Sequence, residues 1–437
     1  MDRTLILDCN DKVGEDVRVC GFVQTKRDHG KITFLDVSDR SGLIQVVTGD
    51  GKGAGFRPQD VVVVSGKVNK RPEHLINKNI PTGTIEIYSH QLEVLSKAAE
   101  LPFDMGTKDL ELQLPTLLDY RSLTLRHPKV KAIFKIQSSL LAGFRKAAQD
   151  LGCMEIVVPT IVAGATEGGA QVFKIDYFGK KAYLSQSPQL YKQMLVPVYE
   201  RVFTIAKAYR AEPSVTTRHL TESTQMDIEI GFIRFEDLLD FLESVAIKML
   251  KFTENKCQQV LAEFGIEKIA FGKIPRLTLR EAQEVIFEEF GRDNRKEKDL
   301  TPQDEIDLCE WSKQKHHSDF VTITHFPTNA KPFYTMPDPN DPQYSLSYDL
   351  LFRGLEILSG SQRINNYNIL AKSIKDRGMN LKSFEMYLQA FKFGCPPEGG
   401  FSFGLERVTM HVLNLKNVRE ASFFPRDMER VDIRLGA

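Results

Sequence analysis

The spacing of hydrophobic residues changes along this chain, and the change restricts it to two unlike folding units. Residues 17–95 contain short β-branched runs, each ended by turn residues such as those at 28–30 and 39–42. From Arg126 onward the apolar residues Val130 and Ile133 begin a stripe with helical steps of three and four. Because 437 residues also exceed one ordinary core, we expect two domains.

The N-terminal unit is predicted to be a small β-barrel. This number and spacing of strands are typical of the OB fold, which commonly binds single-stranded nucleic acid. The strands are expected at residues 17–25, 31–37, 42–48, 60–68 and 84–95. The next stretch combines Pro102 and Pro115 with polar residues and has no clear period. We therefore predict an OB-fold domain at 1–104, a hinge at 105–128 and a second domain at 129–437.

The second domain mixes helical and extended patterns. Helices are expected at residues 235–264, 278–290, 305–315 and 383–393. Strands are expected at residues 182–185, 201–209, 227–233, 320–326, 347–352, 355–359 and 399–404. The two patterns do not alternate as they do in a parallel βαβ sheet. The chain is therefore predicted to be α+β, with helices flanking an antiparallel sheet.

The composition limits the cellular location and the binding partners that we expect for this protein. Basic and acidic residues number 58 each, so any RNA contact must come from local patches. The six cysteines lack metal-ligand or secreted-type spacing, which fits reduced thiols in a cytosol. The N-terminus lacks a targeting pattern, and no apolar run reaches about 18 residues. We expect a soluble cytoplasmic protein without a membrane partner.

Two segments far apart in the chain predict a nucleotide site. Residues 203–220 place Arg210, Glu212 and Arg218 around a short polar loop. Residues 399–407 form a glycine-rich strand that leads into a helix. Guanidinium groups bind phosphate oxygens in a bidentate way, and glycine lets the backbone lie close to a flat base. Neither segment is a P-loop or a dinucleotide motif, so we expect ATP to lie on an antiparallel sheet.

These segments resemble motifs 2 and 3 of the class II aminoacyl-tRNA synthetases. Residues 151–160 resemble motif 1 of that family, because a helix gives way there to a β-branched run that ends at Pro159. Three signatures in the family's order make the resemblance specific, whereas a lone glycine-rich match would be weak. The resemblance implies ATP as a substrate and a homodimer held together by motif 1.

Three further clusters predict which amino acid is activated. The carboxylate of Glu167 lies among small residues and is a candidate partner for a substrate ammonium. Gln189 and Lys192 would face the same way if Pro188 starts a helix. Arg363 supplies a second cation beside Lys192. Two cations predict an anionic substrate side chain, because an unpaired buried charge would cost several kcal/mol in a site for neutral asparagine.

Glu356 and Ser359 are the candidate ligands of Mg²⁺. They would point to opposite faces of a regular strand, so we expect the chain to bend near Gly360. Substituting Arg363 by Leu is expected to abolish aspartate activation while the fold stays intact.

The clusters resemble the aspartyl-tRNA synthetases of the compact archaeal and eukaryotic type, which lack a large inserted domain before motif 3. The asparaginyl enzymes differ in the segment around Lys192. By resemblance, the aspartate-binding residues are Glu167, Gln189, Lys192, Arg210, Ser359 and Arg363. The ATP-binding residues are Arg210, Glu212, Arg218, His219, Leu220, Glu356, Gly404, Leu405, Glu406 and Arg407.

The resemblance also implies a mechanism based on charge and position. Arg210 and Arg407 would be the catalytic residues, holding ATP bent while the aspartate carboxylate attacks the α-phosphorus. The aspartyl group then passes to the 3′ end of tRNA(Asp), and tRNA(Asn) stays open as a second acceptor. Ser402 stands where motif 3 usually has glycine, and it would either crowd the adenine or face away.

Four residues of the predicted barrel are candidates for reading the anticodon. Phe34, Gln45 and Glu86 align by resemblance with anticodon-reading residues, and Arg27 lies beside them. An exposed aromatic ring stacks on an unpaired base, while Gln and Glu read its Watson–Crick edge. Taken alone, Phe34 would more often be a barrel core residue. Gln24 lies where relatives vary in whether they charge tRNA(Asn), and it matches neither pattern.

Two other classes of protein are alternative interpretations of this sequence. An amide ligase of this fold would also adenylate aspartate, but it would not need the barrel at 17–95. A non-catalytic tRNA-binding protein could keep the barrel, but it would not be expected to keep Arg210, Glu356, Arg363 and Arg407 together.

Overall fold

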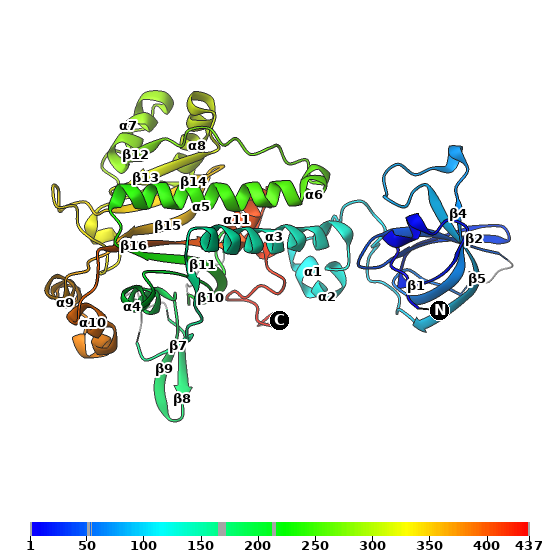
Figure 1. Cartoon of the computed structure of the whole chain (residues 1–437), viewed down its shortest axis with the longest axis horizontal. Helices are drawn as coiled ribbons and strands as arrows, with labels where there is room; N and C mark the ends of the chain where they lie inside the picture. The colour runs from blue at the N-terminus through cyan, green and yellow to red at the C-terminus, as the bar shows by residue number, and fades with distance from the viewer. Residues whose placement is uncertain (1, 50–52, 54, 165–171, 212–215, 436–437) are drawn as a thin grey trace. The chain divides into compact units, whose positions relative to one another are not determined.

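The computed structural model describes residues 2–49, 53, 55–164, 172–211 and 216–435 (Figure 1). The chain divides into two compact units, residues 1–117 and 118–437. This division falls inside the segment predicted as a hinge, which also contains α1 (Leu114–Asp119) and α2 (Arg121–Thr124). Among the described residues, no helix combines the length and apolar character needed to cross a membrane.

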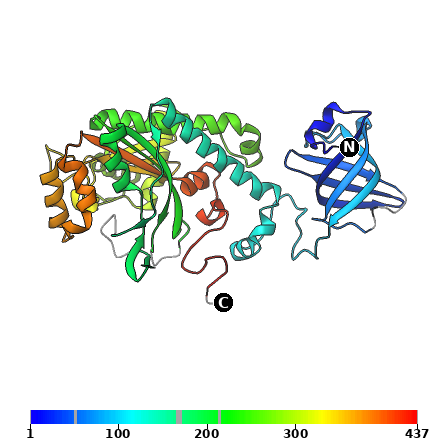
Figure 2. The same ribbon diagram turned by 60° about the horizontal axis from the view of Figure 1, so that its bottom comes forward.

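The N-terminal unit is a closed five-stranded barrel, as predicted. Its strands are β1 (Asp16–His29), β2 (Ile32–Ser38), β3 (Leu43–Thr48), β4 (Val61–Lys70) and β5 (Ile85–Ser96). They pair in the order β1-β2-β3-β5-β4 and curve into a cylinder (Figure 2). Every second residue of β2 is buried, so Thr33, Leu35 and Val37 face the barrel interior while Phe34 and Asp36 lie on the outer side.

The second unit is built on an eight-stranded sheet with the order β12-β13-β14-β15-β16-β11-β10-β6. Its strands are β6 (Met154–Glu155), β10 (Arg201–Tyr209), β11 (Glu222–Gly231), β12 (Arg276–Thr278), β13 (Phe320–Thr324), β14 (Ser347–Phe352), β15 (Leu355–Gln362) and β16 (Glu398–Gly404). The central pairs are antiparallel, as predicted, but β6 and β12 join the edges in parallel. A small separate sheet contains β7 (Ile161–Val162), β8 (Lys174–Tyr177) and β9 (Lys180–Leu184).

Helices cover both faces of the large sheet. They are α3 (Pro128–Asp150), α4 (Gln189–Tyr199), α5 (Phe235–Lys256), α6 (Gln258–Glu263), α7 (Leu279–Phe290), α8 (Pro302–His316), α9 (Tyr367–Asp376), α10 (Glu385–Lys392) and α11 (Leu405–Val412). Figure 1 shows α3 and α5 side by side along the sheet. The predicted helix at 235–264 is two helices that meet at Cys257, and the sequence analysis did not predict α9.

Candidate active site

Alternation along β11 builds the floor of the site. Gln225, Asp227 and Glu229 occupy every second position, so their side chains project from one face of the sheet. Met226 and Ile228 project from the opposite face and are fully buried. The two acids are also buried, at 1% and 0% exposure, instead of facing water. They were not predicted from the sequence, because alternation with apolar residues is typical of a strand whose polar side faces water.

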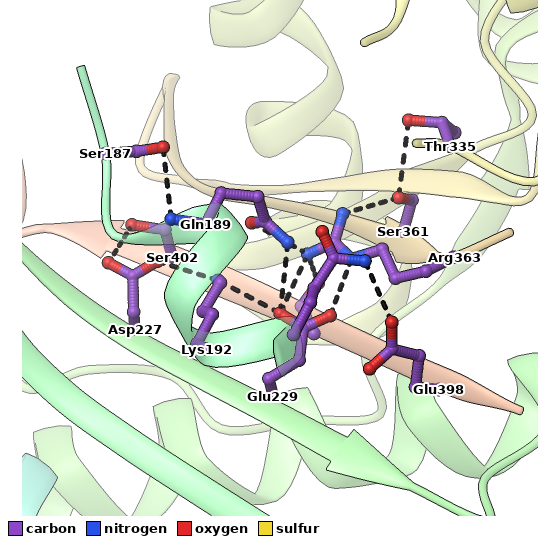
Figure 3. A network of polar contacts seen from close by, with 12 residues as sticks. Ser187, Gln189, Lys192, Asp227, Glu229, Thr335, Ser361, Arg363, Glu398 and Ser402 are labelled. Atoms are coloured by element: carbon purple, nitrogen blue, oxygen red, sulfur yellow. Dashed lines mark hydrogen bonds and ion pairs between the residues drawn. The ribbon is translucent and has the colours of Figure 1, made fainter. Parts of the chain in front are cut away.

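Helix α4 supplies the first cation. It begins directly after Pro188, as predicted, and buries Gln189, Lys192 and Gln193. The Lys192 ammonium lies 2.7 Å from Asp227 Oδ1 and 3.2 Å from Glu229 Oε2 (Figure 3). The predicted one-sided placement of Gln189 and Lys192 is therefore correct.

Arg363, one residue past the end of β15, supplies the second cation. Its Nε lies 2.7 Å from Glu229 Oε1, and its Nη2 donates to the Gly400 carbonyl at 2.9 Å. Its Nη1 donates to Ser361 Oγ at 2.6 Å, and its guanidinium carbon lies 5.2 Å from the centre of the Tyr334 ring. Burial alone would raise the pKa of Glu229, but Arg363 and Lys192 hold that pKa below its ordinary value.

These contacts correct the argument that two buried cations require an anionic substrate. Lys192 and Arg363 already have carboxylate partners within the protein, Asp227 and Glu229. The cluster is therefore balanced before any substrate binds. The same pairing corrects the expectation that Arg363→Leu would leave the fold intact, because the change would leave Glu229 buried beside one fewer cation.

Strand β16 lies against this cluster and explains two residues of the glycine-rich motif. A Cβ atom on Gly400 would lie 2.3 Å from Glu229 Oε2, so glycine is needed there for the acid and not for a nucleotide base. Ser402 neither crowds the cavity nor faces away, since its hydroxyl donates to Asp227 Oδ2 at 2.9 Å. Both residues thus support the charged cluster.

A third acid lies behind the cluster. Glu398 is fully buried, and its Oε1 accepts a hydrogen bond from Gln193 at 2.9 Å. Burial and the nearby Glu229 raise the pKa of Glu398 well above its ordinary value, which favours the neutral form of this carboxyl. The Tyr387 hydroxyl fixes the other end of the Gln193 amide at 3.2 Å.

Two adjoining cavities open above the cluster. The first, about 280 Å³, is lined by the predicted aspartate-binding residues Gln189, Lys192, Arg210, Ser359 and Arg363. The second, about 150 Å³, is lined by the predicted ATP-binding residues Arg210, Arg218, His219, Leu220, Glu356, Gly404, Glu406 and Arg407. Six residues line both cavities: Arg210, Gln225, Glu356, Ser359, Ser402 and Arg407. A molecule in one cavity would therefore lie directly beside a molecule in the other.

Some residues that were predicted to bind ATP or aspartate have another position or contact in the structure, or lie outside the described residues. Leu405 is buried at the start of α11 and does not line the second cavity. The Glu406 carboxylate accepts the Thr224 backbone N–H at 3.0 Å and so ties α11 to β11. Glu167 and Glu212 lie outside the described residues.

A β-bulge brings Glu356 and Ser359 together. Across β14, Leu351 pairs with Glu356 and Leu350 pairs with Leu358, so Ile357 is an extra residue in β15. The bulge shifts the alternation by one, and Glu356 and Ser359 line the same cavities. The predicted bend therefore exists, but it lies at Ile357 and not near Gly360.

The donors at this bulge fit a magnesium ion. Carboxylate and hydroxyl oxygens are hard ligands, and Mg²⁺ is usually held by one or two such groups plus phosphates and water. Burial and repulsion from Asp349 raise the pKa of Glu356, with Arg407 acting in the opposite direction. A bound divalent cation would relieve that repulsion.

A carboxyl of α8 contacts Arg218, one of the residues that line the second cavity. Glu305 Oε2 lies 3.3 Å from Arg218 Nη1. Burial and the charge of Glu356 raise the pKa of Glu305 to about 7. The sequence analysis did not single out this residue, because it lies on a helix far from both motifs.

Comparison with known proteins decides the family. Residues 113–428 match the family described as tRNA synthetases class II (D, K and N), and residues 17–95 match the OB-fold nucleic acid binding domain. The chain belongs to this class II synthetase family. The family and the fold class predicted from the sequence are both confirmed.

Full-length relatives of this synthetase include two enzymes that differ in their named tRNA. An aspartate–tRNA(Asp/Asn) ligase of Thermus thermophilus is 41% identical over 98% of this chain and 99% of its own length. An aspartate–tRNA(Asp) ligase of Pyrococcus horikoshii is 38% identical over 96% of both chains. The crystal structure of asparaginyl-tRNA synthetase from Pyrococcus horikoshii, complexed with asparaginyl-adenylate, matches with a TM-score of 0.90 and 31% identity, over 99% of both chains.

The barrel of the synthetase gathers its four predicted anticodon residues on one surface. Gln45 Nε2 donates to Glu86 Oε2 at 2.8 Å, and Arg27 donates to Gln45 Oε1 at 3.3 Å. Phe34 pairs with Arg27 across β1 and β2. It alternates with the buried Thr33 and is itself half-buried, so the core interpretation of Phe34 is wrong.

Proposed function

We propose that this synthetase is an aspartate–tRNA ligase. The α-carboxylate of L-aspartate would attack the α-phosphorus of ATP and displace pyrophosphate, and the 3′-terminal hydroxyl of tRNA(Asp) would then take the aspartyl group from the adenylate and release AMP. The observation that carries the proposal is the shared wall of the two cavities, where Arg210, Glu356, Ser359 and Arg407 contact both. This wall would bring a substrate carboxylate next to the α-phosphorus of ATP. Positioning of this kind and neutralisation of charge supply the rate.

The aspartate side chain is proposed to bind Lys192 and Arg363. Among the described residues, Arg363 Nη1 donates only to Ser361, so its second hydrogen is available to a substrate carboxylate. Gln189 would orient the same carboxylate, since its amide already lies 3.3 Å from Arg363 Nη2. Glu167 is proposed to receive the substrate ammonium.

Arg210 and Arg407 are the proposed catalytic residues, which hold the triphosphate bent for in-line attack. Arg218, His219, Leu220, Glu406, Gly404 and Glu212 would complete the ATP site. Leu405 would contribute through its backbone, because its side chain is buried. Glu356 and Ser359 would hold Mg²⁺, which neutralises charge on the phosphates when bound.

The remaining proposals concern organisation. We propose a homodimer through the motif 1 segment, where Val157 is 97% exposed and Met154 and Ile161 are also exposed. Residues 1–104 would bind the anticodon through Arg27, Phe34, Gln45 and Glu86, residues 105–128 would act as the hinge, and residues 129–437 would carry catalysis. A cytoplasmic location fits the six cysteines, which are all free thiols.

The experiment that tests the function has two steps. Exchange of pyrophosphate into ATP is measured with aspartate and, separately, with asparagine. Exchange driven by aspartate alone is expected, and exchange driven by asparagine would overturn the proposal. Transcripts of tRNA(Asp) and tRNA(Asn) are then charged with labelled aspartate. Charging of both would mean that the barrel does not discriminate the last anticodon base, and charging of tRNA(Asp) alone would mean that it does.

A further inference from the structure

A third cavity of the second unit, about 910 Å³, has no part in the proposed adenylation. We call it the basic groove. It lies between α7, α9 and the loops around residues 295–298, 327–329 and 342–344. Its cationic side chains are Arg280, Arg295, Lys296, Lys298, Lys372 and Arg377. The acidic residues of its lining are Glu297 and Asp376, so the lining carries an excess of four positive charges in a chain whose net charge is zero. Arg295 also pairs with Asp293 and Glu284, which lie outside the lining.

Part of this charge is not neutralised within the protein. Lys296 and Lys298 are exposed and form no ion pair with any residue that the structure describes. Arg280 lies over the Tyr344 ring, 5.2 Å from its centre, and keeps its charge unpaired in the same described part of the chain. Arg377 donates to the Thr328 carbonyl at 3.2 Å, which fixes its guanidinium at the groove wall. Such groups attract a polyanion more strongly than paired ones do.

The basic groove and the amino-acid cavity share one lining residue. Thr335 lines both of them. Its hydroxyl lies 3.5 Å from Ser361 Oγ, which accepts the 2.6 Å hydrogen bond from Arg363 Nη1 (Figure 3). A chain whose end reached the amino-acid cavity could therefore pass its preceding units along the groove.

We propose that the basic groove binds successive backbone phosphates of the RNA that is being charged, close to its 3′ end. This inference rests on the proposed function. The cations sit on long side chains from separate segments, which suits repeated phosphates along a strand. A small nucleotide would instead need an enclosed site with buried, convergent polar groups. The loops and helix that carry the cations belong to no motif of the adenylation site.

The test uses the full-length protein and two matched double variants. Lys296→Ala/Lys298→Ala removes two charges from the groove, while Lys375→Ala/Lys382→Ala removes two exposed charges that do not line it. For the groove variant, kcat/KM for tRNA is expected to fall roughly tenfold at low salt. The slope of log kcat/KM against log salt is expected to decrease by about 2, since each lost phosphate contact removes about 1. Aspartate-dependent pyrophosphate exchange should stay unchanged in both variants.

An unchanged tRNA kcat/KM and salt slope in the groove variant would overturn the inference, as would an equal change in the control. Tripolyphosphate, titrated by calorimetry, distinguishes a small free polyanion from RNA. Loss of tripolyphosphate binding without any change for tRNA would also overturn it. If the unsubstituted protein catalyses no exchange, the proposed function fails separately, and salt-dependent binding of the tRNA transcript still tests the groove.

Discussion

Two polar clusters of this synthetase, one on the catalytic sheet and one on the barrel, are made in the same way but kept in different surroundings. Each takes polar side chains from strands, Asp227 and Glu229 from β11 in the sheet and Gln45 and Glu86 from β3 and β5 in the barrel. The sheet cluster adds Lys192 from helix α4. In the sheet, the Lys192, Glu229 and Arg363 side chains are at most 5% exposed. In the barrel, Arg27 is 51% exposed and Phe34 is half-buried.

The difference teaches how each cluster is stabilised. Charges taken out of water need partners inside the protein, because an uncompensated buried ion costs several kcal/mol. The sheet cluster therefore has its cations and carboxylates matched, and removing one member disturbs the fold as well as the substrate site. In the barrel cluster Arg27 and Phe34 stay in contact with water, so these two can be changed at little structural cost and are available to an RNA partner, whereas Glu86 is only 4% exposed.

The largest effect is expected from Arg363→Leu. The change leaves Glu229 with Lys192 as its only cation, and we expect the free energy of unfolding to fall by about 3–5 kcal/mol. Aspartate-dependent pyrophosphate exchange should be abolished. Urea denaturation followed by circular dichroism measures the first effect, and an exchange assay on folded protein measures the second.

Its matched control is the double variant Arg363→Leu/Glu229→Leu, which removes one charge of each sign. Lys192 keeps Asp227 as its partner at 2.7 Å. Most of the lost stability should return while activity does not. Equal instability of the single and double variants would refute the charge-matching explanation.

A second, smaller effect is expected from pH. The pKa of Glu305 is raised from 4.5 to about 7 in the folded state, so its contribution to stability is complete below about pH 4.5. That contribution is lost as pH rises through about 7, by about 2–3 kcal/mol. Glu305→Gln should therefore lose less stability than the unsubstituted protein over this range. Chemical denaturation at several pH values measures the difference, and parallel curves would contradict the assignment.

A change in the barrel should affect tRNA charging and leave stability almost unchanged. Phe34→Ala is expected to lower kcat/KM for tRNA by roughly 10-fold to 100-fold, since stacking of one base contributes about 1–3 kcal/mol. Pyrophosphate exchange and the melting temperature should hardly change. Leu95→Ala, at an exposed position of β5, is the control that should leave tRNA charging unaffected. A large loss of stability in Phe34→Ala would mean that the ring supports the barrel.

The smallest effect is expected from Glu398→Gln. Because burial and Glu229 favour the neutral form of this carboxyl, an amide of the same shape should replace it and accept the Gln193 hydrogen bond. We expect a stability change below about 1 kcal/mol, measured by denaturation. A loss as large as that of Arg363→Leu would show that Glu398 is ionised and belongs to the matched charges.

Much of the fold follows from local patterns. The spacing of apolar residues and the positions of Gly and Pro predict the barrel strands, the antiparallel centre of the sheet and α4 after Pro188. These signals act over a few residues. Helix α9 was not predicted because its apolar stripe is short. Its buried residues Leu370 and Ile374 belong to a cluster with Phe333 and Tyr387, which are distant in sequence. A bend that brings Glu356 and Ser359 together was predicted, but near Gly360. The bulge lies at Ile357 because its position depends on the pairing of β15 with β14.

The sequence by itself determined the family, the two domains and many of the residues that line the two cavities, because those depend on residue type at short spacing. Only the tertiary structure decided how the charges are matched. Asp227 and Glu229 lie on a strand with an ordinary alternating pattern, and nothing local marks that face as buried. Their partners come from α4 and from the end of β15, far away in sequence. Burial and charge pairing are properties of the packed layers, so they appear only when those layers meet.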